Sequence, residues 1–286
     1  MPKRSFKQSL LLTIKGLAMG AADVVPGVSG GTIAFISGIY EELISTIHSL
    51  DLGVFKTLKK QGLKKAWQDY NLGFLAALFT GIAISILSLA KLITMLLGQY
   101  PVLVWSFFFG LVIASIIYIA KQITNYNLKA IIALVFAAVL SYGITLAEPI
   151  ADTESIWFLF IAGFIAIIAM ILPGISGAFI LLLIGGYTVV IGAINQLIDS
   201  LSTLNLSGLG NALLKIGVFA VGAIAGLKVF SGVLNWMFKN HKDTTLAVLT
   251  GFMIGALNKI WPWKQVLQYR KTSHGEEIPF IEKSIL

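Results

Sequence analysis

The chain has 286 residues, of which 57% are hydrophobic and 12% are charged. An ordinary soluble domain has about 25% charged residues, so this composition excludes a soluble globular protein. The absence of cysteine excludes disulfides, thiolate metal sites and cysteine catalysis, and we assign the net charge of +8 to short basic loops beside a membrane rather than to nucleic-acid binding.

Apolar runs close to the length of a membrane span recur along most of the chain. A helix needs about 20 residues to cross a bilayer. The runs are Leu72–Leu97, Val102–Ala120, Leu128–Ala147, Ile156–Leu172, Ala178–Ile198, Ala212–Phe238 and the shorter Leu246–Leu257. No polar segment is long enough to fold separately, so we expect a single transmembrane domain, residues 1–286, in an all-α polytopic membrane protein.

A helix-breaking motif follows the first apolar segment and occurs again in the second half of the chain. The first copy is Asp23-Val-Val-Pro-Gly-Val-Ser-Gly-Gly-Thr32, and the second, 147 residues later, is Ile171-Leu-Pro-Gly-Ile-Ser-Gly-Ala178. In membrane transporters, interrupted segments at matching positions of two halves indicate the substrate site.

The N-terminal segment Met1–Ala22 has the basic start and small residues of a secretory signal peptide. However, Ile156–Met170 precedes the second motif as Leu10–Ala22 precedes the first. We therefore expect the N-terminal segment to be retained as a member of the repeat.

The similarity between the halves continues beyond the motif, with a shorter offset of 141 residues that places Gly81 on Gly222 and Gly110 on Gly251. This alignment predicts repeat one at about residues 8–122, a connecting helix at about 128–147, repeat two at about 155–262 and a polar C-terminal tail at 263–286.

Loop charges predict that the two repeats have opposite orientations. The N-terminus and the loop Asp51–Tyr70 are both basic, which is typical of cytoplasmic segments, whereas the segment Glu148–Glu154 is acidic. Two re-entrant helical hairpins plus about five full transmembrane helices satisfy this pattern. The basic residues after Asn258 do not fit this pattern, because the same topology places them on the non-cytoplasmic side of the membrane.

The motif combines features that suit an anion. Proline starts a helix without needing a donor, the glycines expose backbone N–H groups, and Ser29 and Thr32 add hydroxyls. The competing interpretation is that proline and glycine only kink packed helices, but the inverted duplication favours binding. The predicted substrate-binding residues of the motifs are Pro26, Gly27, Ser29, Gly30, Gly31, Thr32, Gly174, Ser176 and Gly177.

Three charged residues are further candidates. Asp23 either carries protons or caps the following helix, and Glu41 is the second candidate for proton coupling. Lys228, near the middle of Ala212–Phe238, can pair with a phosphate or extend to the membrane interface. No spacing typical of a metal site or a catalytic triad occurs, so neither a cofactor nor enzymatic activity is expected.

The chain resembles the bacterial polyprenyl-phosphate transporters, formerly a domain of unknown function. The resemblance is carried by Gly20–Ala34, Gly38–Glu41, Leu172–Gly177 and Trp261–Lys264. It implies a flippase in the bacterial cytoplasmic membrane, with a cytoplasmic N-terminus, that recycles undecaprenyl phosphate for cell-wall polymer synthesis. It also implies that Asp23, Ser29, Gly30, Gly31, Thr32, Glu41 and Ser176 fall on motif positions.

Two other functions stay open at this point. A small-anion transporter or channel fits the paired motifs equally well, and a lipid-phosphate enzyme is disfavoured because no histidine or cysteine lies near either motif. The expected partners are polyprenyl phosphate and membrane lipids, without nucleic acid, and a homo-oligomer is compatible with the sequence.

Overall fold

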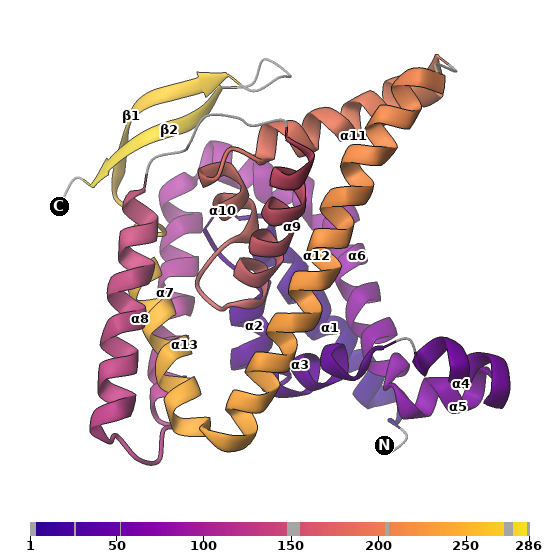
Figure 1. Ribbon diagram of the computed structural model, residues 1–286. Helices are drawn as coiled ribbons and strands as arrows, with labels where there is room; N and C mark the ends of the chain where they lie inside the picture. The colour runs from indigo at the N-terminus through magenta and orange to yellow at the C-terminus, as the bar shows by residue number, and fades with distance from the viewer. Residues whose placement is uncertain are drawn as a thin grey trace.

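A computed structural model describes residues 4–25, 27–51, 53–147, 155–203, 206–271 and 277–284. Within these ranges the membrane part is entirely helical (Figure 1). The first half and its connecting helix comprise α1 (Phe6–Asp23), α2 (Gly30–Ile36), α3 (Tyr40–Ser49), α4 (Gly53–Gln61), α5 (Leu63–Asp69), α6 (Leu72–Gln99), α7 (Pro101–Ala120) and α8 (Leu128–Leu146).

The second half repeats the order of the first without the two short helices α4 and α5. It comprises α9 (Ile156–Ile171), α10 (Gly177–Leu183), α11 (Tyr187–Ser202), α12 (Leu206–Asn240) and α13 (Lys242–Ala256). Helices α1–α3 form hairpin one and helices α9–α11 form hairpin two. In Figure 1 hairpin one lies toward the lower end of the molecule, where the N-terminus is, and hairpin two starts and ends at the upper end.

Four glycines give the two hairpins the same backbone path. Gly27 and Gly174, in the motifs, have φ values of 84° and 89°, and Gly38 and Gly185 have values of 72° and 77°. Positive φ is strained for residues with a side chain but accessible to glycine. The helix that was expected to follow each motif is therefore broken into two, α2 with α3 and α10 with α11, and the second pair is bent by 105°.

Glycines also set the contact between each hairpin and the long helix beside it. Helix α1 packs on α6 and α9 packs on α12, and in each pair a Cβ added to a glycine would overlap a backbone carbonyl oxygen of the partner helix. The four contacts are Gly16 with Leu78, Gly163 with Phe219, Gly81 with Thr13 and Gly222 with Phe160. Adding 147 to the α1 residues and 141 to the α6 residues gives the residues of the matching contacts between α9 and α12, so the two halves pack alike.

At one further contact the glycine is on the first helix of the pair in one half and on the long helix in the other half. Gly20 of α1 faces Ser85 of α6, whereas the related pair is Ile167 of α9 facing Gly226 of α12. A Cβ on Gly20 would lie 2.8 Å from the Ser85 Cβ, and one on Gly226 would lie 2.8 Å from the Ile167 Cγ2. Close helix packing needs one small residue at each crossing, and either helix can supply it.

Helix α13 is fixed along α8. A Cβ on Gly251 would meet the Leu134 carbonyl oxygen and one on Gly255 would meet the Ala138 carbonyl oxygen. At the start of α13, the Asp243 carboxylate accepts hydrogen bonds from the Thr124 N–H at 3.0 Å and the Asn125 N–H at 3.1 Å. These contacts determine where the end of α13 lies.

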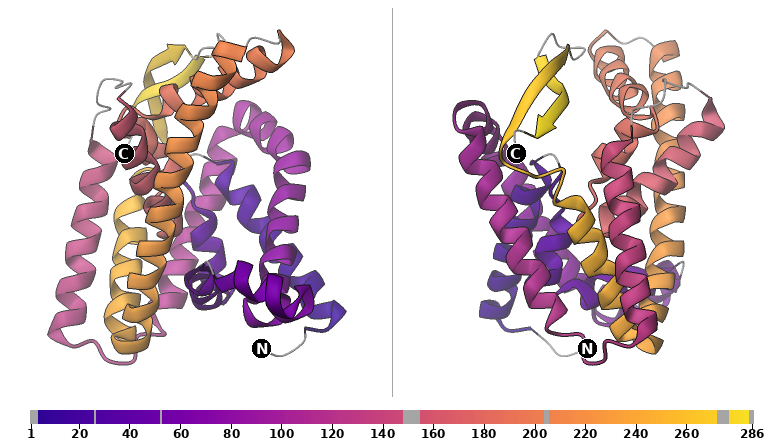
Figure 2. Two further views of the ribbon diagram at one scale, coloured as in Figure 1. Left: turned by 45° about the vertical axis from the view of Figure 1, so that its right-hand side comes forward. Right: turned by 90° about the vertical axis from the view of Figure 1, so that its left-hand side faces the viewer.

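By length and apolar composition, α6, α7, α8 and α12 qualify as membrane spans in the described chain, and α10 with α11 would make a fifth if the bent pair were one span. Helix α13 has 15 residues. The N-terminus and the C-terminal strands lie at opposite ends of the molecule in both views of Figure 2. Basic residues therefore lie at both ends of the molecule, so the loop-charge rule does not hold for both the N-terminus and the residues after Asn258. The acidic segment Glu148–Glu154 lies outside the described residues.

Two segments have structure that the sequence analysis did not predict. The tail expected to be only polar contains the antiparallel strands β1 (Lys264–Lys271) and β2 (Glu277–Ser284). The basic loop Asp51–Tyr70 contains α4 and α5, which present both lysines and exposed apolar side chains such as Phe55 and Trp67. This combination is typical of helices that lie at a membrane surface.

The opposite orientation of the hairpins predicts a labelling result. The chain has no native cysteine, so Lys60→Cys on α4 and Ser202→Cys on α11 each introduce one exposed thiol. A membrane-impermeant maleimide added to intact cells should label the second variant alone, and opening the cells should expose the first. Labelling of both thiols from the same side would contradict inverted hairpins.

Candidate functional site

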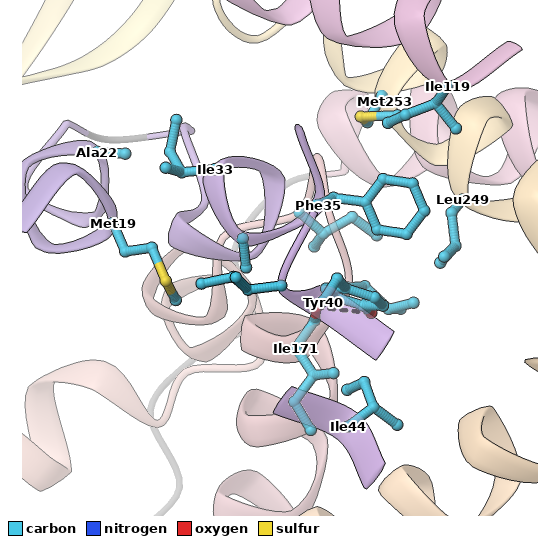
Figure 3. Close-up of a cluster of buried hydrophobic side chains, with 14 of the residues drawn as sticks. Met19, Ala22, Ile33, Phe35, Tyr40, Ile44, Ile119, Ile171, Leu249 and Met253 are labelled. Atoms are coloured by element: carbon cyan, nitrogen blue, oxygen red, sulfur yellow. Dashed lines mark hydrogen bonds between the residues drawn. The ribbon is translucent and has the colours of Figure 1, made fainter. Parts of the chain in front are cut away.

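The two motifs contact each other in the interior of the protein. The Gly174 N–H donates to the Thr32 Oγ1 at 3.0 Å, and the Ser29 Oγ donates to the Leu172 carbonyl oxygen at 3.4 Å. The Tyr40 hydroxyl donates to the Ile171 carbonyl oxygen at 3.1 Å (Figure 3). Three hydrogen bonds therefore join hairpin one to the segment that carries the second motif.

Much of the first motif is satisfied within the protein. The Gly30 N–H donates to the Asp23 Oδ1 at 2.6 Å, and the Gly31 N–H donates to the Ser29 Oγ at 3.1 Å. Ser29 and Thr32 are buried, whereas Asp23 is exposed. Asp23 and Ser29 thus cap the start of α2, which is the structural role that the sequence analysis considered for Asp23.

The other motif glycines allow close packing. A Cβ on Gly31 would lie 2.8 Å from the Ile171 carbonyl oxygen, and one on Gly177 would lie 2.7 Å from the Ala166 carbonyl oxygen. Gly31 therefore brings α2 against hairpin two, and Gly177 brings α10 against α9. The Ser176 Oγ caps α10 by accepting from the Phe179 N–H at 3.4 Å. Pro26 lies outside the described residues.

A small cavity lies where the motifs meet. Among the predicted residues, Gly27, Gly174 and Ser176 line it. The remaining lining residues are Ser141, Ile144, Thr145, Ile175, Phe179 and Lys259. We call this space the motif cavity. It is bounded by both hairpins, by the last turns of α8 and by the turn after α13, which places it toward the end of the molecule that bears the C-terminal strands (Figure 1).

Sequence reasoning missed Lys259, Ser141 and Thr145. In the sequence, the basic residues after Asn258 are notable only because they do not fit the loop-charge pattern. Lys259 is 232 positions after Gly27 in the chain, yet a Cβ on Gly27 would lie 3.1 Å from the Lys259 Cγ. A lysine in a short polar segment after a membrane span gives no signal of such a contact.

The other two predicted charged residues lie outside the lining of the motif cavity. The Lys228 Nζ donates to the carbonyl oxygens of His48 and, at 2.7 Å, of Leu50, so it caps the C-terminal end of α3. Glu41 forms an ion pair with Lys242 at 2.8 Å. Both contacts join α3 of hairpin one to α12 or α13 of the second half.

Glu42, next to Glu41, forms a second polar group at the same end of the molecule. Arg4 pairs with Glu42 and donates to the Asn71 Oδ1 at 2.9 Å. The Asn71 amide donates to Glu42 at 2.8 Å and to the Thr46 Oγ1 at 3.1 Å. Residues of hairpin one thus connect α3 to the start of α6.

An aromatic cluster lies between these polar contacts and the motifs. The rings of Phe35 and Tyr40 have centroids 4.8 Å apart, and the Phe238 ring from α12 lies 6.0 Å from Tyr40 and 6.4 Å from Phe35. Figure 3 shows Phe35 and Tyr40 beside Ile44, Leu249 and Met253 in one apolar core. Hairpin one therefore packs against the second half between the motifs and the end of the molecule that bears the N-terminus.

Comparison with known proteins identifies relatives along nearly the whole chain. The family model for VCA0040-like proteins, described as undecaprenyl phosphate translocase-like, matches residues 19–278. A polyprenyl-phosphate transporter of Vibrio cholerae is 46% identical over 273 residues, which are 95% of this chain and 84% of that protein. A polyprenyl-phosphate transporter of Staphylococcus aureus is 35% identical over 262 residues, 87% of this chain and 85% of that protein. No solved structure matches. The chain therefore belongs to the undecaprenyl phosphate translocase-like family.

Proposed function

We propose that this protein transports polyprenyl phosphate across the bacterial cytoplasmic membrane, with undecaprenyl phosphate as its substrate. Returning this lipid to the cytoplasmic face would recycle the carrier for cell-wall polymer synthesis. The names of both relatives support the polyprenyl-phosphate class, and the family description supports the undecaprenyl chain. The observation that carries the proposal is that two inverted hairpins contribute to one cavity, which is the arrangement of alternating-access transporters.

The headgroup would bind in the motif cavity. Gly27 and Gly174 both line this cavity, so a phosphate bound there would lie beside the backbones of both motifs. The Ser176 hydroxyl lies at the same cavity and can donate a hydrogen bond while still accepting one from the Phe179 N–H. The hydrocarbon tail would remain among the exposed apolar side chains that face the bilayer.

Movement of hairpin one would change the side from which the headgroup is reached. The cavity lies toward the end that bears the C-terminal strands, and the aromatic cluster and the Glu41–Lys242 ion pair close the N-terminal side. We propose that the N-terminal side is cytoplasmic and that this conformation binds substrate from outside. Separation of α3 from α12 and α13 would then release it inward.

Reconstitution tests the function directly. Purified protein in liposomes should speed the disappearance of undecaprenyl phosphate from the outer leaflet, without release of inorganic phosphate. Excess free phosphate should compete poorly, since the lipid tail adds affinity. Phosphate release would indicate an enzyme, and uptake of free phosphate without lipid movement would indicate a small-anion carrier.

The two motif serines should differ in this assay. Ser176→Ala removes a hydroxyl from the cavity, and a hydrogen bond to a charged group contributes about 1.5–3 kcal/mol, so apparent affinity should fall roughly tenfold or more. Ser29→Ala instead removes the cap of α2 and should lower stability by about 1 kcal/mol. Thermal unfolding in detergent separates the loss of stability from the loss of affinity. Equal affinities of Ser176→Ala and the unmodified protein for the lipid would show that Ser176 does not contact the headgroup.

A further inference from the structure

Lys259 lies at the end of α13, in a turn whose backbone is fixed. The Lys259 N–H donates to the Ala256 carbonyl oxygen at 2.9 Å, and the Ile260 N–H donates to the Leu257 carbonyl oxygen at 3.2 Å. Ile260 is only 1% exposed and anchors the turn in the core. Lys264 donates to the Lys259 carbonyl oxygen from the other side. The position of the Lys259 side chain therefore follows from the packing of α13 rather than from a mobile tail.

The Lys259 side chain connects the two motifs. Its stem lies on Gly27, where a Cβ would approach the Lys259 Cγ to 3.1 Å and the Lys259 Cβ to 3.8 Å. Its Nζ lies 4.7 Å from the ring centroid of Phe179, three residues after Ser176 on α10. The stem thus contacts motif one, and the ammonium group lies beside the start of the helix that follows motif two.

The lining of the cavity suits a cation that receives an anion. It includes no carboxylate, so Lys259 supplies the only formal charge among the lining residues. The hydroxyls of Ser141 and Thr145 donate to the carbonyl oxygens of Phe252 and Tyr142, which leaves the Ser176 hydroxyl as the cavity hydroxyl that can donate to an anion. A contact between an ammonium group and an aromatic ring contributes about 0.5–1 kcal/mol at exposed sites. Hydrogen bonds between an ammonium group and phosphate oxygens are charge-assisted and stronger, so the contact with Phe179 is compatible with phosphate binding.

We infer that Lys259 binds the phosphate group of the substrate and is the cationic contact of the motif cavity. The inference rests on the proposed function, and it assigns the role that the sequence analysis considered for Lys228. The ligand chemistry is a phosphate monoester or inorganic phosphate, held by the ammonium group together with the Ser176 hydroxyl. Phosphate binding would explain why a basic residue occurs at position 259, where the loop-charge pattern does not predict one.

Equilibrium binding tests the inference. Full-length protein in nanodiscs is titrated with undecaprenyl phosphate, and the change in tryptophan fluorescence gives the dissociation constant. Lys259→Gln should weaken binding by about ten- to hundredfold, whereas Lys259→Arg should retain most of the affinity because it keeps the charge. Lys129→Gln, which neutralises an exposed lysine at the opposite end of α8, is the matched control and should bind as the unmodified protein does.

A second measurement needs no variant. Amine-reactive labelling followed by mass spectrometry should show protection of Lys259, but not of Lys129, when undecaprenyl phosphate is bound. Protection by inorganic phosphate at similar concentrations would identify free phosphate as the ligand source. Unmodified protein that fails to bind or move the lipid would refute the proposed function, whereas binding that is unchanged in Lys259→Gln and gives no protection of Lys259 would refute this inference alone.

Discussion

A Gly174→Val protein is expected to lose transport and much of its thermal stability. Gly174 has a φ of 89°, and a Cβ there would lie 2.8 Å from the Met253 Cα and 3.0 Å from the Phe252 carbonyl oxygen. These are backbone atoms of α13, which is fixed along α8 and cannot give way as a flexible side chain could. The substitution would push motif two away from α13 and break the hydrogen bond from the Gly174 N–H to Thr32.

The expected cost has two parts that a control can separate. The strained backbone conformation contributes about 1–3 kcal/mol, and the overpacked contact contributes about 1–3 kcal/mol more. Gly38→Ala tests the first part alone, since Gly38 has a φ of 72° but nothing within 4 Å of an added Cβ. Thermal unfolding in detergent should rank Gly174→Val well below Gly38→Ala. Similar values for the two would show that the contact with α13 does not matter.

The internal duplication made most of the fold predictable. The two offsets relate Gly16 and Leu78 to Gly163 and Phe219, and the structure packs both pairs in the same way. Patterns of this kind can be read from the sequence because they are local to each helix and occur twice. The C-terminal hairpin of β1 and β2 has no counterpart in the first half, so the repeat gave no signal for it.

The candidate site was only partly predictable, because its chemistry depends on distant contacts. The sequence showed hydroxyls and exposed N–H groups in both motifs, but not that Asp23, Ser29 and Thr32 already pair with such N–H groups. Lys228 looked suitable in the middle of a span, yet it caps α3. Lys259 looked like a tail residue, yet it contacts Gly27. Only the packing of α13 against both hairpins distinguishes the two lysines.

Asp23→Asn is expected to abolish accumulation driven by a proton gradient while leaving headgroup binding nearly intact. Asparagine can accept the Gly30 N–H as the carboxylate Oδ1 does at 2.6 Å, so the cap of α2 is kept and only titration is lost. Asp23→Ala removes both, and should also lower stability by about 1 kcal/mol. Comparing the two variants therefore separates the structural role of Asp23 from proton coupling.

Transport by Asp23→Asn should be measured in liposomes with and without an imposed pH gradient. The gradient should accelerate the unmodified protein and have no effect on the variant, while binding of undecaprenyl phosphate stays close to normal. Glu41→Gln serves as the comparison, because Glu41 pairs with Lys242 at 2.8 Å in an exposed position and such pairs contribute little to stability. Asp23 is exposed beside the start of α2 and bonded to motif one, so a change in its charge would act directly on the hairpin proposed to move. If Asp23→Asn responds to the gradient normally and Glu41→Gln does not, Asp23 is only a helix cap, and coupling depends on the ion pair that holds α3 to α13.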